Sequence, residues 1–301
     1  MPNGVFLLNK PSGISSNRAL QISKRLLTAS KAGHTGTLDP MAQGLLPICL
    51  GEATKFSSAL LGADKTYVAV MRLGYVSNTG DAEGDIVPAT GTNAMTGELD
   101  SQQVLAVLRT FLGRSSQIPP MFSALKKKGK PLYYYAREGI AVERQAREIV
   151  IHDISLDAWS GSEMTVTVRC GSGTYIRTLA EDIGKALGYG GAYLTALTRT
   201  GIGLFELSQA CSLDQLEADP QAAREQFLYP ADVLLSDLPA IVLNDIEAFQ
   251  LKQGQRIQRT MTHSHLPANS KLRLYDSSDR FLGLGEWIDS ETIAPKRLMM
   301  Q

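Results

Sequence analysis

The residues best suited to chemistry lie in the segment AGHTGTLDP, residues 32–40. Its two glycines permit positive φ angles and close backbone approaches, and Pro40 biases Asp39 towards an extended conformation. A carboxylate on such a constrained loop can act as a nucleophile or stabilise developing positive charge. The alternative is that Asp39-Pro40 forms an ordinary turn and that His34 is a surface loop residue.

A second candidate is CGSGTYIR, residues 170–177, where a strand is expected to pass through a glycine turn into a helix. The GSGT stretch could bind a phosphate at the helix N-terminus, although neither GxxxxGK[ST] nor GxGxxG is present. Arg177 would lie in the first helical turn, where a positive charge opposes the helix macrodipole. We therefore expect Arg177 to have an anionic partner elsewhere; the alternative is a surface arginine with no special partner.

Charge is distributed unevenly along a chain whose 30 basic and 30 acidic residues cancel. Residues 121–150 contain seven Lys or Arg against three Asp or Glu, and four of the seven are Lys126, Lys127, Lys128 and Lys130. Such segregation could form a basic face for nucleic acid on a protein without net charge. The alternative is a solvated loop with no ligand.

The spacing of cysteine and histidine residues gives little support for metal or cofactor chemistry. The three cysteines are widely spaced and outside any CxxC pattern, so free thiols in a reducing cytosol are expected. His263 and His265 have no third ligand nearby, and we expect no metal and no cofactor. The N-terminus lacks a signal-peptide pattern, and no apolar run approaches the ~18–20 residues of a spanning helix. We therefore expect a soluble cytoplasmic protein.

The elements that must position these residues follow from hydrophobic periodicity. Ser15 or Ser16 can cap a helix whose apolar residues include Ala19 and Leu26. Residues 65–77 are mostly apolar on both faces, which predicts a central strand. Tyr67 is on the inward face of that strand, where core packing is the default expectation. We also expect strands at 4–9 and 44–50, a loop at 32–43, a helix from 51 to 62 and an amphipathic helix at 101–112.

From residue 118 onwards, the sequence predicts a less regular arrangement of strands and helices. Residues 118–147, rich in Lys and Tyr, are interpreted as a long excursion from the core. Strands at 149–157 and 164–170 and a helix at 177–187 should follow. Strands and helices interleave irregularly, which favours a mixed-sheet α+β domain over a doubly wound one.

A composition change near Leu238-Pro239 predicts a domain boundary. The preceding segment is acidic and helical in character, whereas short β-like runs separated by turn residues follow it. We therefore predict a catalytic domain over residues 1–237, with a thumb-like segment at about 118–147. A small β-barrel-like domain should cover residues 238–301.

Several motifs occur together in a recognisable order. Residues 33–55 contain the long pattern GHTGTLDP…GLLP…GEATK, preceded by NKPSG at 9–13. KTY at 65–67 and GTYIRTL at 173–179 follow. Over about residues 4–210 the chain resembles the TruB family of tRNA pseudouridine synthases, and PMFSALK at 120–126 resembles the thumb of its bacterial branch. The tail resembles a PUA RNA-binding domain more weakly.

The resemblance implies a reaction and a set of site residues. The family isomerises uridine 55 in the T-arm of tRNA, and the resemblance implies a monomer that needs neither a membrane nor an obligate protein partner. Catalytic roles fall to Asp39, Tyr67 and Arg177, and base flipping or base contact to His34, Tyr67, Tyr175 and Leu197. RNA-binding roles are assigned to Lys55, Arg199 and the lysines Lys126, Lys127, Lys128 and Lys130. Met41, Gln43 and Thr198 depart from the family pattern, and Thr198 puts one RNA-backbone contact in doubt.

This chemistry accounts for the residue types. Pseudouridine formation breaks the N1–C1′ bond, turns the uracil and rejoins it through C5, so it is redox-neutral and needs no cofactor. Asp39 must be ionised, and we expect Arg177 to lower its pKa against desolvation. The nucleotide must leave its stack, so His34 could fill the gap while Tyr67 packs on the uracil. Whether Asp39 attacks C1′, adds to the ring or assists proton loss from C2′ stays open.

Two alternatives remain. One is an enzyme of the same fold guided by a separate RNA within a ribonucleoprotein. The thumb-like segment and the lack of a long N-terminal extension disfavour it. The other is an RNA-binding or RNA-folding protein whose catalysis is incidental, and the set Asp39, Tyr67 and Arg177 argues against it.

Overall fold

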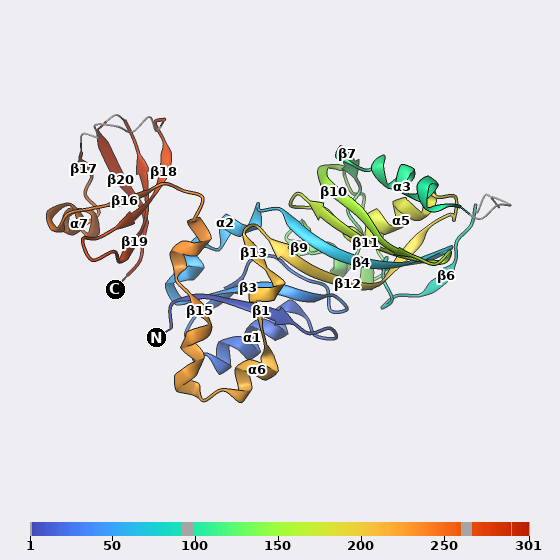
Figure 1. The fold of residues 1–301 in the computed structure, drawn as a ribbon, viewed down its shortest axis with the longest axis horizontal. Helices are drawn as coiled ribbons and strands as arrows, with labels where there is room; N and C mark the ends of the chain where they lie inside the picture. Colours follow the sequence, from blue (N-terminus) through green and yellow to red (C-terminus); the bar gives the residue numbers. More distant parts are fainter. Residues whose placement is uncertain (1, 92–98, 260–266, 290, 301) are drawn as a thin grey trace.

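The computed structural model describes residues 2–91, 99–259, 267–289 and 291–300. A large sheet runs through most of the molecule, and a second sheet lies apart from it near the C-terminus (Figure 1). His263 and His265 lie outside the described residues. No helix in the described ranges is long and apolar enough to cross a membrane.

The large sheet has eleven strands, eight of which follow the order β14-β1-β3-β12-β4-β11-β10-β7. β2, β13 and β15 pair with β3, β12 and β1, respectively. The bounds are β1 (Gly4–Lys10), β2 (Ala32–His34), β3 (Gln43–Leu50), β4 (Lys65–Leu73), β7 (Gly113–Gln117), β10 (Arg147–Trp159), β11 (Glu163–Cys170), β12 (Ala192–Ile202), β13 (Phe205–Glu206), β14 (Cys211–Ser212) and β15 (Leu228–Tyr229).

β12 lies between β3 and β4, parallel to the first and antiparallel to the second. The parallel register places Arg199 opposite Gly44. Gly44 has φ +101°, and a side chain there would collide with the carbonyl oxygen of Arg199. Glycine at this position therefore lets the two backbones approach closely enough to pair.

Alternation along β1 divides the apolar residues between two cores. Phe6 and Leu8 belong to the larger core, to which α1 (Ser16–Leu26), α3 (Ser101–Arg109) and α5 (Ile176–Ala186) contribute. Val5 and Leu7 belong to a second core with the 3-10 helices η1 (Gly51–Phe56) and η4 (Ala231–Leu235) and with α2 (Ser58–Leu61). Helical elements thus cover both faces of this end of the sheet.

The excursion between β7 and β10 forms a small unit of its own. It contains the hairpin β8 (Lys126–Lys127) and β9 (Lys130–Pro131), followed by α4 (Leu132–Arg137). A second hairpin, β5 (Tyr75–Ser77) with β6 (Ile86–Pro88), follows β4. The first of these units is the segment expected to form the thumb.

The C-terminal sheet has five strands in the order β16-β18-β19-β20-β17. Leu251, Leu272, Leu274 and Trp287 are buried in its own core. Its elements are β16 (Ala240–Val242), α7 (Asp245–Lys252), β17 (Ile257–Gln258), β18 (Ser270–Tyr275), β19 (Phe281–Trp287) and β20 (Thr292–Leu298). The segment that leads to it holds η2 (Leu207–Gln209), α6 (Leu213–Ala218) and η3 (Gln221–Phe227).

The C-terminal sheet contacts η1. Lys55 Nζ donates to the Leu298 carbonyl at 2.8 Å, and the Met300 backbone N–H donates to Glu52 Oε2 at 2.6 Å. The rings of Phe56 and Phe281 meet edge-on with centroids 5.5 Å apart. Charged, polar and aromatic contacts together join the tail to the larger sheet.

The predicted mixed-sheet α+β class is confirmed, with several changes in detail. The strand predicted at 65–77 ends at Leu73, because Gly74 has φ +81° and the chain turns into a separate hairpin. The helix predicted from 51 to 62 is a 3-10 helix followed by a short α-helix. The loop predicted at 32–43 contains the short strand β2. β12 was not predicted, although it is central to the sheet.

Candidate active site

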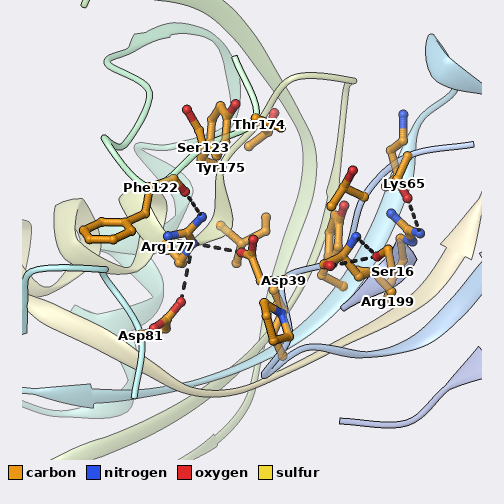
Figure 2. A pocket seen from close by; sticks show the side chains of 18 of the residues that line it. Ser16, Asp39, Lys65, Asp81, Phe122, Ser123, Thr174, Tyr175, Arg177 and Arg199 are labelled. Carbon is orange, nitrogen blue, oxygen red and sulfur yellow. Dashed lines mark hydrogen bonds and ion pairs between the residues drawn. The ribbon is translucent and has the colours of Figure 1, made fainter. Parts of the chain in front are cut away.

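A cavity of about 740 Å³ lies beside the loop that follows β2. Its walls come from that loop, the start of β4, the segment before the thumb hairpin, the N-terminus of α5 and β12 (Figure 2). All six residues to which catalytic or base-contacting roles were assigned line it, namely His34, Asp39, Tyr67, Tyr175, Arg177 and Leu197. The structure thus brings distant motifs to one site.

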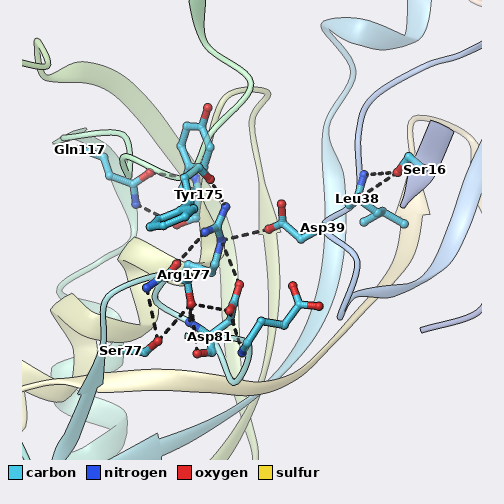
Figure 3. Close-up of polar contacts among 11 residues, drawn as sticks. Ser16, Leu38, Asp39, Ser77, Asp81, Gln117, Tyr175 and Arg177 are labelled. Carbon is cyan, nitrogen blue, oxygen red and sulfur yellow. Dashed lines mark hydrogen bonds and ion pairs between the residues drawn. The ribbon is translucent and has the colours of Figure 1, made fainter. Parts of the chain in front are cut away.

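The loop bearing Asp39 is fixed by hydrogen bonds to its surroundings. The buried hydroxyl of Ser16 donates to the Leu38 carbonyl and accepts from the Leu38 N–H, both at 2.8 Å (Figure 3). On either side, the Thr35 N–H donates to the Pro47 carbonyl at 3.2 Å, and the Pro40 carbonyl accepts from the Gly13 N–H at 2.8 Å. A loop held in this way can present its carboxylate in one orientation.

Asp39 forms an ion pair with Arg177. Arg177 Nε lies 3.0 Å from Asp39 Oδ2 and 3.7 Å from Asp81 Oδ2. Nη2 donates to the Phe122 carbonyl at 2.7 Å (Figure 2). Nη1 donates to the Thr79 carbonyl at 2.6 Å. The guanidinium is therefore held from several sides, and the anionic partner expected for Arg177 is present.

Burial raises the pKa of Asp39 above its ordinary value, and the charge of Arg177 opposes this rise. The nearby Asp81 carboxylate adds to the rise in pKa. The sequence predicted both influences correctly, and desolvation is the larger of the two. The Asp39 side chain is 36% exposed, against 3% for Asp81, so the cavity is open to Asp39.

Two tyrosines and a leucine supply an apolar lining. Burial raises the pKa of Tyr67 and of Tyr175 above the ordinary phenol value of 10.0, so ionisation of either ring is further disfavoured. The side-chain amide of Gln117 accepts from the Tyr175 N–H at 2.8 Å and donates to its carbonyl at 3.1 Å (Figure 3). The rings of Tyr67 and Tyr175, together with the buried side chain of Leu197, can contact a planar base.

His34 is half-buried at the edge of the cavity. Burial, together with the nearby charge of Arg199, lowers the pKa of His34 below its ordinary value. Its Nδ1 is buried and has no hydrogen-bond partner among the described residues. A neutral imidazole of this kind suits stacking better than phosphate binding.

The GSGT turn offers less than a complete phosphate site. Gly171, Gly173 and Thr174 line the cavity, but the Thr174 hydroxyl donates to the Gly171 carbonyl at 3.0 Å. The N–H of Tyr175, at the N-cap of α5, is already bound to Gln117. Two of the polar groups that could bind a phosphate therefore have partners within the protein.

Two residues assigned to RNA binding have other surroundings. Arg199 is 1% exposed and lines the cavity, so it lies inside the site and not on the outer surface, and its assignment to RNA binding stays a prediction. Lys55 Nζ lies 2.6 Å from Glu52 Oε2 and also binds the Leu298 carbonyl. Its ammonium joins η1 to the C-terminal sheet, a role that the sequence pattern did not predict.

The four thumb lysines are exposed, as an RNA contact requires: Lys126, Lys127, Lys128 and Lys130. Lys130 Nζ lies 4.3 Å from the centroid of the Tyr134 ring, a cation–π contact. Lys127 Nζ donates to the Glu143 carbonyl at 3.1 Å. Tyr133 and Arg137 of α4 line the cavity, so the thumb reaches the site.

Three charged residues near Asp39 were not singled out from the sequence. Lys10 is fully buried and donates to the carbonyls of Pro11, Ile14 and Pro40, and burial lowers its pKa to about 8. Asp81 and Glu83 line the cavity. Lys10 belongs to the NKPSG motif, but only the tertiary fold shows that these three residues lie near Asp39. The residues in the described ranges contain no group of His, Cys, Asp or Glu suited to a metal ion.

Comparison with known proteins identifies relatives of the whole chain. The model of the TruB family pseudouridylate synthase N-terminal domain matches residues 24–176. The tRNA pseudouridylate synthase B C-terminal domain matches residues 177–236, and the pseudouridine synthase II TruB C-terminal model matches residues 239–299.

Individual relatives agree. A Nitrosomonas europaea protein named tRNA pseudouridine synthase B is 69% identical over 293 residues, which cover 97% of this chain and 94% of that protein. A protein of the same name from Nitrosospira multiformis is 57% identical over 299 residues, which cover 99% of this chain and 95% of that protein. A chain in the crystal structure of the archaeal box H/ACA sRNP Nop10-Cbf5 complex shares the fold, with a TM-score of 0.72 and 23% sequence identity. The match covers 99% of this chain and 86% of that chain. The chain therefore belongs to the TruB family of pseudouridylate synthases and is an enzyme.

Proposed function

We propose that this enzyme isomerises uridine 55 in the T-arm of tRNA to pseudouridine. The observation that carries the proposal is the Asp39 carboxylate, held 3.0 Å from the buried guanidinium of Arg177 at the wall of an open cavity. The relatives named tRNA pseudouridine synthase B support tRNA as the substrate. The cavity volume of about 740 Å³ is in the usual range for a small-molecule site and has room for an extruded nucleotide.

In the proposed mechanism, the carboxylate acts on a base that has left its stack. Asp39 is ionised and attacks C1′, adds to the uracil ring or assists proton loss from C2′ as the N1–C1′ bond breaks. Tyr67, Tyr175 and Leu197 hold the uracil while it turns. C5 then bonds to C1′ and loses its proton, and N1, released from C1′, gains a proton, so the product has the same composition as the substrate. His34 fills the space that the uridine leaves in the RNA. All bonding partners come from the substrate, so the proposed reaction needs no cofactor.

RNA binding is proposed to involve two regions beyond the cavity. The exposed thumb lysines contact phosphates near the T-arm, which positions the RNA without reading its sequence. The C-terminal segment, residues 238–301, is a PUA-like domain that adds an accessory contact to RNA, and residues 1–237 are the catalytic domain. We further propose that the enzyme acts as a cytoplasmic monomer.

The test uses the purified full chain and an unmodified tRNA transcript. Pseudouridine is mapped along the product, with a transcript carrying cytidine at position 55 as the substrate control. We expect one new pseudouridine, at position 55, and none in the control RNA. Modification at other positions only would refute the uridine 55 assignment. Activity that appears only after a separate guide RNA is added would favour the RNA-guided alternative.

A further inference from the structure

We propose that Arg199 is a positioning residue: its guanidinium holds the Gly36 carbonyl and thereby sets the loop that carries Asp39. Arg199 Nε donates to the Leu45 carbonyl at 2.8 Å, and Nη2 donates to the Gly36 carbonyl at 3.2 Å. Gly36 lies between His34 and Asp39 in the chain. One side chain thus ties the catalytic loop to β3.

The backbone of Arg199 connects the same parts of the site. It lies opposite Gly44 in the parallel pairing with β3 and opposite Tyr67 in the antiparallel pairing with β4. Movement of Arg199 would therefore affect the strand of the base-contacting tyrosine as well as the loop of the carboxylate. Ser16 anchors the loop at Leu38, and Arg199 is a second anchor on the Asp39 side of His34.

The charge of Arg199 is difficult to explain as packing alone. Among the described residues, no carboxylate forms an ion pair with Arg199, whereas Arg177 has Asp39 and Asp81 within 4.0 Å. Burying a guanidinium without a carboxylate is costly, and hydrogen bonds to carbonyls offset only part of that cost. An apolar residue would avoid this cost but would leave the Gly36 and Leu45 carbonyls without these donors. The structure therefore points to Arg199 as a residue retained for the geometry of the loop.

The first variant is Arg199→Lys, which keeps the charge but lacks the planar fork that reaches two carbonyls. The matched control is Arg224→Lys. Arg224 donates to backbone carbonyls as well, three in its case against two for Arg199, namely those of Leu26, Glu217 and Asp219, and it does not line the cavity. Both substitutions remove hydrogen bonds from an arginine to backbone carbonyls. The difference is that only Arg199 binds the loop that carries Asp39.

Single-turnover rates at saturating RNA, RNA affinity and thermal midpoints are measured for both variants. We expect Arg199→Lys to lower the rate by about 10²-fold, the loss expected when a reacting group is displaced by ~1 Å. RNA affinity should stay within about threefold, because the substitution alters the reacting geometry and leaves the surface contacts to RNA in place. Arg224→Lys should retain the wild-type rate. An Arg199→Lys enzyme with the wild-type rate would overturn the proposal.

Amide hydrogen exchange separates positioning from a general loss of folding. In Arg199→Lys we expect faster exchange at Leu38 and Ala42 and unchanged exchange in β4 and β11. Equal acceleration throughout the sheet, with a normal rate per folded molecule, would refute a positioning role. If Arg199→Lys does not fold, Arg199→Gln removes the buried charge, retains a donor and is subject to the same measurements and outcomes.

The inference rests on the proposed role of Asp39, but its failure can be told apart from a failure of the proposed substrate. The wild-type enzyme is first tested for the uridine that it modifies, and the variants are then compared on that RNA. A wild-type enzyme that modifies another uridine refutes the uridine 55 assignment only. A normal rate for Arg199→Lys on the RNA that the wild type modifies refutes the role of Arg199 only.

Discussion

Arg177 Nε lies 3.0 Å from Asp39 Oδ2, although Asp39 lies in the loop between β2 and β3 and Arg177 lies in α5. The same guanidinium donates to the Thr79 and Phe122 carbonyls, so its position is determined by segments that surround the cavity. Asp39 consequently has a fixed cation beside it and an open cavity in front of it. This pairing leads to predictions about rate, pH and RNA affinity.

Asp39→Asn should abolish isomerisation and leave RNA affinity largely intact, because the substitution removes charge but little volume. Turnover is measured on unmodified tRNA, and affinity by filter binding of the same RNA. Each tenfold loss of rate corresponds to about 1.4 kcal/mol of barrier. Retention of more than about 1% of the wild-type turnover, a barrier change below ~2.7 kcal/mol, would show that the carboxylate is not essential.

The single-turnover rate should fall as the pH is lowered through the pKa of Asp39. Burial raises this pKa above its ordinary value of 3.8, and the active form is ionised, so the acid limb should lie above that value. Arg177 lowers the pKa against burial. Arg177→Gln should therefore move the acid limb to higher pH, in addition to lowering the rate, whereas Arg224→Gln should not move it. An acid limb that stays in place or moves to lower pH in Arg177→Gln would contradict the assignment.

Neutralising the thumb should weaken RNA binding and make it less dependent on salt. The combined variant changes Lys126, Lys127, Lys128 and Lys130 to Gln, and affinity is measured over a range of salt concentrations. For each phosphate that is no longer neutralised by a lysine, the slope of log K against log salt should fall in magnitude by about 0.7–0.9. The exposed Lys185, paired with Glu181 on α5, supplies the control Lys185→Gln. An unchanged slope in the combined variant would exclude these lysines as phosphate contacts.

Removing residues 239–301 should raise KM and leave kcat nearly unchanged. Every proposed catalytic residue precedes the tail, which carries eight basic and five acidic residues from 251 onwards. Contacts to phosphates alone add affinity that is similar in the ground and transition states. The truncation exposes Phe56 and the Lys55 ammonium, so its thermal midpoint should fall, and circular dichroism must first show that it is folded. A well-folded truncation whose kcat collapses at saturating tRNA would mean that the tail helps to assemble the active site.

The sequence predicted the cavity residues better than their surroundings. The resemblance of the motifs to the TruB family implied that Asp39, Tyr67 and Arg177 belong to one site, whereas residue types and spacing alone left an ordinary turn, core packing and a surface arginine as alternatives. The motifs could not predict that Asp81 shares the guanidinium of Arg177, since this contact depends on how the β5–β6 hairpin packs. The buried ammonium of Lys10 was missed for the same reason.

Lys55 and Arg199 show a related difficulty, because each has partners within the protein that the sequence did not predict. Lys55 lies in the GEATK motif and Arg199 was assigned from the family resemblance, and a cation at such a position in an RNA-modifying enzyme suggests a contact with RNA. Burial depends on tertiary packing, and here it depends on β12 and on the C-terminal sheet. β12 itself was missed because its sequence hides its alternation: burial alternates along the strand, but the register shifts between Leu194 and Ala196, and one of the buried positions is occupied by the charged Arg199.

The insertion of β12 between β3 and β4 has a consequence for synthesis on the ribosome. β3 and β4 emerge early and are successive main strands, yet they cannot adopt their final arrangement until β12 has been translated. At roughly 5–20 residues per second, that interval lasts on the order of ten seconds. During this time the nascent chain has Asp39 but lacks Arg199 and Leu197, so it cannot yet form the complete cavity. The order of translation thus delays a working enzyme until most of the chain has been made.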